Sequence, residues 1–143
     1  MISRNCDPKI PSVLSFGHFE ALGATNVIPS KAILKGTFRT MDEQWRERAL
    51  DQIKSQVEKI ASANGATVDV QISRGYPCLD NDTVLTEKLY LKAKEVLGDE
   101  NVVDLPIRLT SEDFSFYSQE IPVCFFRLGV RDESKGIVYG VHN

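Results

Sequence analysis

The sequence has few cysteines and no long hydrophobic run, and each of these shortages excludes a class of protein. Its three cysteines lie far apart, in none of the paired spacings of a zinc or redox site, and we expect reduced thiols. Cys124 falls in the apolar run 122–129, where a small buried hydrophobic residue is expected rather than a nucleophile. No apolar run approaches the roughly 20 residues of a membrane helix, and residues 1–12 lack the hydrophobic stretch of a signal peptide. We therefore expect no membrane association and a cytoplasmic location.

An excess of basic residues is also lacking. The 17 lysines and arginines are outnumbered by 20 acidic residues, and a formal net charge of −3 gives no field for a nucleic-acid backbone. The length of 143 residues, with 42% apolar and 26% charged residues, is ordinary for about one soluble globular domain. Nucleic acid is therefore not an expected partner.

The first 40 residues predict two strands joined by a loop. Residues 13–20 are apolar and aromatic, residues 23–30 have the composition of a loop, and residues 32–40 alternate in character. In the second strand Leu34 and Phe38 share one face, and the opposite face carries Lys35, Thr37 and Arg39. Arg39 is therefore predicted to point away from the core.

A helix and a third strand are predicted next. Thr40 and Glu43 fit a capping box at the start of a helix, and Asn64 and Gly65 fit its end. The apolar stripe of this helix comprises Trp45, Ala49, Ile53, Val57 and Ile60. Residues 67–73 alternate as a half-covered strand would, through Val68, Val70 and Ile72. This half thus predicts an antiparallel sheet with one helix and an open face.

Residues 75–82 are rich in residues that break helices and strands, and the sequence pattern changes after them. An amphipathic helix is predicted from Leu85 to Gly98, then a brief strand at 102–105, a polar turn at 110–113 and a short helix at 114–119. Residues 121–130 are apolar on both faces, as in a strand that is covered on both sides. The second half is therefore interpreted as a slice of an α/β domain, and the whole chain as α+β.

Five separated segments carry a family resemblance. They are "GATNVIP", "KGTFRT", "SEDFSFY", "IPVCFFRLG" and the terminal "GVHN", and they occur in family order. The sequence resembles the C-terminal part of the zinc-dependent aminoacylase and hippurate hydrolase family of amidohydrolases, a group of metallopeptidases.

The resemblance implies a two-part molecule, of which this chain is a fragment. Residues 1–76 would be most of a ferredoxin-like βαββαβ lid that also forms a homodimer contact, without its first strand and most of its first helix. Residues 80–143 would be the last piece of an α/β catalytic domain. The intact parent would hold two divalent metal ions, with zinc favoured and manganese or cobalt as alternatives. The two histidines of this sequence cannot build such a centre, so the fragment alone is expected to bind no metal and to be inactive.

The resemblance also assigns roles to residues in the lid. Arg39 matches the arginine that binds the substrate carboxylate, which suits the planar two-donor fork of a guanidinium. The alternative is a solvated arginine on an open strand face. Asn26 matches the lid asparagine before Ile-Pro, whose amide can donate to a carboxylate or an oxyanion. Its alternative is a turn asparagine that bonds its own backbone.

Three further residues fall in the second half. His142 matches a C-terminal histidine that ligates one metal in intact relatives, although a histidine beside a chain end is usually just exposed. Ser111 and Glu112 are assigned to the wall of the substrate pocket. The alternative for them is a helix start, with Ser111 as the N-cap and Glu112 facing the helix dipole.

His18, in the first half, has no ligand partner at useful spacing and is expected to be structural or on the surface.

Two functional hypotheses follow. In the first, the parent is a metal-dependent amidohydrolase that cleaves the amide bond of N-acyl amino acids or similar small conjugates. In the second, the chain is a stand-alone, non-catalytic dimerisation or binding module derived from the lid, whose strand edges pair with a partner.

Overall fold

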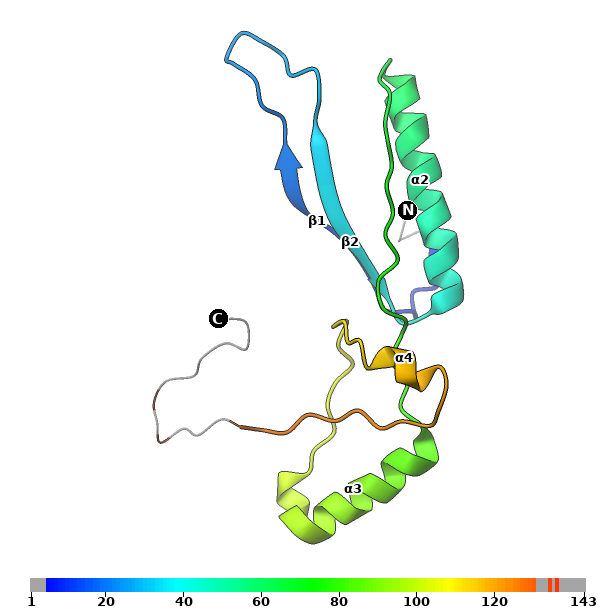
Figure 1. Cartoon of the computed structure of the whole chain (residues 1–143), viewed down its shortest axis with the longest axis vertical. Helices are drawn as coiled ribbons and strands as arrows, with labels where there is room; N and C mark the ends of the chain where they lie inside the picture. Colours follow the sequence, from blue (N-terminus) through cyan, green and yellow to red (C-terminus); the bar gives the residue numbers. More distant parts are fainter. Residues whose placement is uncertain (1–4, 131–133, 135, 137–143) are drawn as a thin grey trace.

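A computed structural model describes residues 5–130, 134 and 136 of the chain. Two parts are joined by residues 64–82, which form a turn at 64–65 and then run without helix or strand structure (Figure 1). The first part consists of β1 (Ser12–Glu20), β2 (Ile33–Thr40) and α2 (Glu43–Ala63). The second part consists of α3 (Thr83–Leu97), the 3₁₀ turn η1 (Asp99–Asn101) and the one-turn helix α4 (Ser115–Ser118). The described residues are thus α+β, as the sequence predicts, while the division into 1–76 and 80–143 and the ferredoxin-like topology stay predictions.

The two predicted strands form an antiparallel hairpin. Ser12 pairs with Thr40 at one end and Glu20 with Ile33 at the other, with a bulge at Gly17 between Phe16 and His18. One extra residue on β1 shifts the register there, and a glycine imposes the smallest steric demand at such a point.

Helix α2 begins with a different cap from the one predicted. The side chain of Asp42, in an extended conformation, accepts a hydrogen bond from the backbone N–H of Trp45 at 2.6 Å. The capping-box prediction for Thr40 is wrong because Thr40 still belongs to β2, where its hydroxyl accepts a bond of 2.9 Å from Ser12 Oγ. The end of the helix is as predicted, since Asn64 is the C-cap and Gly65 has a φ of 71°.

The core of the first part lies where α2 begins. Trp45 and Ala49 are fully buried, and the ring of Phe38 meets Trp45 edge to face at 6.3 Å. The indole Nε1 of Trp45 donates to Ser12 Oγ at 3.0 Å, which ties the helix to the start of β1. Farther along the same apolar stripe Ile60 is 62% exposed, so the stripe is less buried toward the C-terminus of α2.

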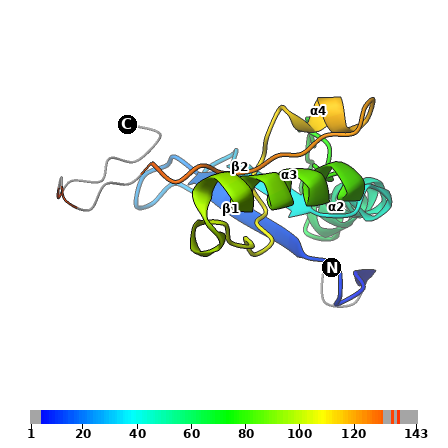
Figure 2. The same cartoon turned by 90° about the horizontal axis from the view of Figure 1, so that it is seen from below.

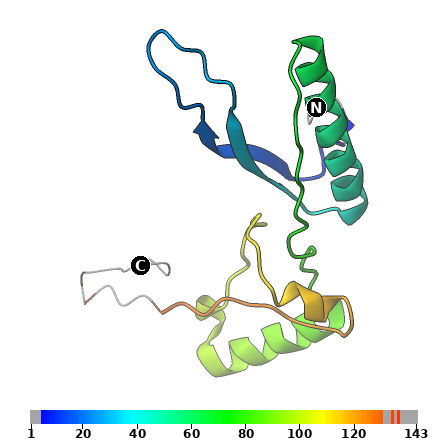
Figure 3. The ribbon, with the colours of Figure 1, turned by 45° about the horizontal axis from the view of Figure 1, so that its top comes forward.

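The predicted strand at 67–73 is not a strand in the structure. These residues run back along α2 in extended form (Figures 1 and 3), and Val68 and Ile72 are 41% and 39% exposed. Within the described residues the sheet consists of β1 and β2 alone. The alternation of apolar and polar residues is compatible with a strand. A strand also requires a neighbouring strand whose backbone N–H and C=O groups are free to pair with it.

The second part confirms the predicted helices and corrects the predicted strands. Asp82 caps α3 by accepting from Leu85 N at 2.8 Å, and Gly98 ends it with a φ of 91°. Residues 102–105 and 121–130 have no strand structure, and Phe126 and Leu128 are about 70% exposed (69% and 72%). Within the described residues no strand lies beside 121–130 to complete a ladder. The segment runs past α3 and α4 (Figure 2), and the side chain of Asn81 makes two hydrogen bonds to its backbone. In the part of the chain that the structure describes, no helix has the length and apolar character to cross a membrane.

Candidate functional site

Arg39 connects the two parts of the chain. It is the penultimate residue of β2 and is exposed on the face opposite Phe38, as the strand alternation predicts. Its Nη1 donates to the backbone carbonyl of Leu109 at 2.8 Å, across 70 residues of sequence. A guanidinium has five N–H donors, and this bond uses one of them. Arg39 therefore lies where β2 meets the second part.

A second arginine holds the segment that Arg39 touches. Nη2 of Arg127 lies 3.4 Å from the hydroxyl of Thr110 and 3.8 Å from the carboxylate of Glu112. Residues 109–112 are thus contacted by both Arg39 and Arg127, and we call them the arginine-flanked segment. Both arginine side chains and the carboxylate are at least one third exposed, so the ion pair is a weak, solvent-screened one.

The structure brings Ser111 and Glu112 into this segment beside Arg39. Ser111 is exposed and is not the N-cap of α4, because that helix begins only at Ser115 and has no side-chain cap. Ser115 is fully buried, and its hydroxyl donates to the carbonyl of Glu112 at 2.6 Å. Sequence analysis missed Ser115, although a serine between two phenylalanines in "FSF" is an indication of a polar group with an internal partner.

Asn26 is not brought to the same place. It occupies an exposed turn in which Val27 N donates to Ala24 O at 3.1 Å, at the loop end of the hairpin. Arg39 lies six residues beyond Ile33 on β2, so the two positions are separated by about 20 Å or more along the strand. Within one chain, Asn26 and Arg39 do not form a common binding site.

The histidines have different outcomes. His142 lies outside the described residues, so its metal role stays a prediction. His18 is on the surface of β1, as expected, with Nε2 3.6 Å from the carboxylate of Glu20. Across the described residues no group of three His, Cys, Asp or Glu side chains could hold a metal ion. These residues alone therefore do not fit the two-metal centre that the resemblance implies.

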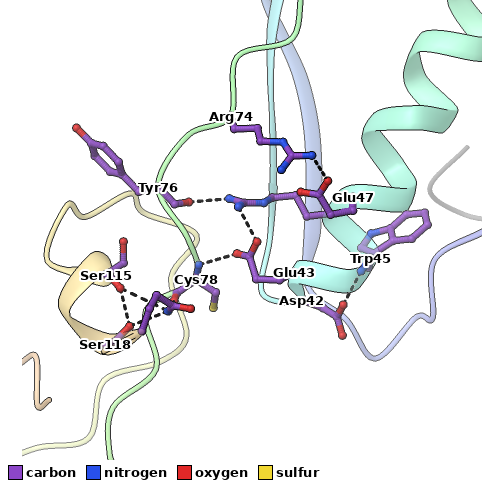
Figure 4. Close-up of polar contacts among 11 residues, drawn as sticks. Asp42, Glu43, Trp45, Glu47, Arg74, Tyr76, Cys78, Ser115 and Ser118 are labelled. Carbon is purple, nitrogen blue, oxygen red and sulfur yellow. Dashed lines mark hydrogen bonds and ion pairs between the residues drawn. The ribbon is translucent and has the colours of Figure 1, made fainter. Parts of the chain in front are cut away.

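A polar network fills the junction between the two parts (Figure 4). The carboxylate of Glu43 accepts from the backbone N–H of Cys78 at 2.7 Å and pairs with Arg46 at 2.6 Å. Nη1 of Arg46 donates to the carbonyl of Tyr76 at 2.7 Å, and Glu47 pairs with Arg74. The first turns of α2 thus hold the backbone that leads into the second part. Sequence analysis missed this network because Glu43 and Arg46 also fit an exposed i,i+3 ion pair on a helix.

Cys78 lies inside this network and is not activated. Burial raises the pKa of its thiol, and the carboxylates of Asp80 and Glu43 raise it further. A raised pKa leaves less thiolate, which is the nucleophilic form. All three cysteines are free and partly buried in the structure, and their reduced state stays a prediction.

Comparisons with known proteins give this geometry a family context. A family model described as peptidase family M20/M25/M40 matches residues 6–143. YhaA of Bacillus subtilis, which is named as an amidohydrolase, is 34% identical over all of this chain and 36% of its own length. Thermostable carboxypeptidase 2 of Saccharolobus solfataricus is 33% identical over 99% of this chain and 35% of its own length.

One solved structure extends the similarity to the fold. A protein of methicillin-resistant Staphylococcus aureus, described as an aminohydrolase, matches 85% of this chain with a TM-score of 0.69 and 28% sequence identity. The match covers 31% of that protein. The chain thus spans about a third of the length of the relatives it resembles.

Proposed function

Because the chain belongs to peptidase family M20/M25/M40, we propose that it is part of a metal-dependent amidohydrolase that hydrolyses the amide bond of N-acyl amino acids or similar small conjugates. Relatives named amidohydrolase and carboxypeptidase support hydrolysis of an amide or peptide bond. The observation that carries the finer proposal is Arg39, an exposed guanidinium held against the arginine-flanked segment. The substrate would therefore bind at the junction of the two parts.

In this proposal Arg39 binds the free carboxylate of the substrate. Its bond to Leu109 fixes the guanidinium while four N–H donors stay available, and a carboxylate accepts two of them side by side. Fixing the carboxylate places the neighbouring amide bond at a defined distance from the arginine-flanked segment. Ser111 and Glu112 would line that side of the substrate, with Arg127 near the Glu112 carboxylate.

Asn26 enters the proposal through a second copy of the chain. Its distance from Arg39 along the hairpin separates the two side chains within one copy. A homodimer that places the 21–32 loop of one copy over the junction of the other would bring the Asn26 amide to the bound substrate. The proposed partner is thus a second copy, in contact through the hairpin.

Metal ions would supply a Lewis acid for the amide carbonyl when bound. This chain would contribute His142 as one ligand, and the remaining ligands would come from outside the described residues. The described residues act on the other side of the reaction, where they bind and orient the substrate. We accordingly propose that the residues of this chain are inactive without the rest of the protein.

The proposal is tested by Arg39→Ala in the complete protein that contains this chain. The KM for an N-acyl amino acid should rise by roughly 10²-fold, since a charge-assisted bond of up to about 3 kcal/mol is lost. The methyl ester of the same substrate has no carboxylate, so its KM should hardly change. Lys35→Ala, on the same face of β2, is the matched control. Equal effects on acid and ester would remove Arg39 from carboxylate binding.

A second candidate function rests on the exposed apolar residues of the hairpin. Phe19, Leu22 and Ile28 are 72%, 81% and 93% exposed, which is unusual for a monomer and suits a binding module without catalysis. Sedimentation of the chain with and without Phe19→Ser and Ile28→Ser tests this candidate. A monomer would exclude the module. Since the amidohydrolase proposal also expects a dimer through the hairpin, a dimer that these changes dissociate would favour the module only if the complete protein does not hydrolyse N-acyl amino acids.

A further inference from the structure

The first turn of α2 and the linker form a joint whose parts are all polar. Glu43 Oε1 and Oε2 bond Cys78 N and Arg46, and Arg46 bonds Tyr76 O, so two side chains hold two backbone groups (Figure 4). The side chain of Arg46 is only 17% exposed, although an isolated arginine on a helix would extend into solvent. Charged hydrogen bonds in such a half-buried site are stronger than those at the surface.

The joint lies next to the proposed substrate arginine in both sequence and space. Arg39, the penultimate residue of β2, lies only four residues before Glu43, so a short stretch of backbone connects it to the joint. The acceptor of Arg39, Leu109 O, belongs to the second part, which the chain reaches through Tyr76 and Cys78. Any rotation at residues 76–78 therefore changes the position of Leu109 relative to Arg39.

We propose that Glu43 and Arg46 are positioning residues that fix the angle between the two parts and thereby hold Arg39 against the arginine-flanked segment. The inference that this placement serves substrate binding rests on the proposed function. The mechanical claim does not depend on it. Arg39 makes a single exposed bond to Leu109, whereas the joint makes two bonds to the linker backbone, one of them partly buried. The joint is thus the stronger constraint on the angle.

A ring contact from the second part adds order to the same joint. Tyr76, whose carbonyl accepts from Arg46, meets Phe116 of α4 edge to face at 5.7 Å. The linker backbone is therefore held from both parts.

The mechanical claim is tested by distance measurement in the complete protein. Nitroxide labels would be attached to cysteines that replace Lys54 on α2 and Lys88 on α3, both exposed, after every native cysteine of the complete protein is changed to serine. Electron-spin resonance should give one narrow distance distribution in the parent and a broader or shifted one in Arg46→Met. Arg48→Met, on the same helix but lying over the Trp45 ring, should leave the distribution unchanged. An unchanged distribution in Arg46→Met, or a broad one in the parent, overturns the proposal.

Kinetics test whether the joint acts through Arg39. Arg46→Met should raise the KM for an N-acyl amino acid by roughly tenfold with a smaller change in kcat, because a displaced binding group loses affinity before chemistry. In an Arg39→Ala background the same change should have almost no effect on KM. Glu43→Gln retains the acceptor for Cys78 N and should have a smaller effect than Glu43→Ala.

The two experiments fail in different ways. Full additivity of Arg46→Met and Arg39→Ala would show that the joint does not act through Arg39, and it overturns the positioning role. If the complete protein does not hydrolyse N-acyl amino acids, the proposed function fails while the distance measurement still decides whether Glu43 and Arg46 set the angle.

Discussion

Asn81 and Phe125 exchange two hydrogen bonds across 44 residues of sequence. The side-chain amide donates from Nδ2 to Phe125 O at 2.9 Å and accepts from Phe125 N at 2.8 Å on Oδ1. Next to this pair, Asp82 N donates to Val123 O at 2.8 Å. One asparagine thus offers Phe125 the donor and acceptor that a neighbouring strand would offer. This arrangement holds the 121–130 segment in place although it is not a β-strand.

Replacing Asn81 with alanine should release this segment. The two hydrogen bonds lie at an exposed position, so the free energy of unfolding should fall by about 1 kcal/mol, the lower end for two net bonds. The loss is measured by thermal unfolding, and exchange of the Phe125 amide should accelerate. Asn81→Asp retains an acceptor for Phe125 N but has no donor for Phe125 O, so it should recover only part of the protection.

The matched control for Asn81 is Gln71→Ala. Gln71 carries an exposed amide that bonds Asp69 within the linker, so its removal should change stability by no more than about 0.5 kcal/mol. Equal losses for Asn81→Ala and Gln71→Ala would show that the Asn81 pair does not hold the segment.

Local patterns explain which elements could be predicted from sequence. Helices α2 and α3 have apolar stripes and terminal residues within a short stretch, and both form nearly where expected. The segments 67–73 and 121–130 also have suitable patterns, but a strand depends on a partner that no local pattern supplies. Pattern alone therefore overpredicted the sheet.

In the candidate site, too, local features could be predicted from the sequence, whereas contacts between distant residues could not. Alternation along β2 predicted the exposure of Arg39, because the face of a strand residue follows from its position. Its bond to Leu109 spans 70 residues and depends on how the two parts are set against each other. The family resemblance placed Arg39 and Asn26 in one site, and only the hairpin register shows that one chain separates them.

Asp42 should stabilise the N-terminus of α2. Asp42→Ala removes the acceptor for Trp45 N and should lower the free energy of unfolding by about 1 kcal/mol. Asp42→Asn retains a capping oxygen and should lower it by only a fraction of that. The single tryptophan, fully buried at this position, reports unfolding in urea by its fluorescence.

The control for Asp42 is Gln44→Ala, an exposed change in the same turn of α2 that should be nearly neutral. If Asp42→Ala is as mild as Gln44→Ala, the N-terminus of α2 does not depend on the Asp42 carboxylate.

Cys78 should react slowly with alkylating agents in the folded chain. Burial, Asp80 and Glu43 raise the pKa of its thiol, so at mildly alkaline pH the folded chain has less thiolate there than the unfolded chain. The rate of iodoacetamide modification, followed at Cys78 by peptide mass spectrometry, should reach its plateau at a higher pH in the folded state. Glu43→Gln removes one of the carboxylates and should lower the pKa of Cys78, which moves the curve toward lower pH.

The same shift has a consequence for stability. Since the pKa of Cys78 is higher in the folded than in the unfolded state, the folded chain binds more protons in the alkaline range. The contribution of Cys78 to folding stability should be constant below the pKa of its thiol in the unfolded chain. It should fall as the pH rises through the pKa of the thiol in the folded chain. Cys78→Ser should lack this decline when unfolding is measured at several alkaline pH values. Parallel pH profiles for the two proteins would contradict the raised pKa.

Gly36 should be the least replaceable residue of β2. A Cβ atom at this position would lie 2.5 Å from Ser15 O and 2.6 Å from a ring carbon of Phe16, closer than van der Waals contact allows. The backbone oxygen belongs to the paired strand and cannot move without opening the hairpin, so Gly36→Ala should cost about 1–3 kcal/mol in urea unfolding. Gly17→Ala is the matched control, because its Cβ would meet nothing within 4 Å at the bulge of β1. A loss for Gly17→Ala as large as that for Gly36→Ala would attribute the effect to glycine in general and not to the close approach of the two strands.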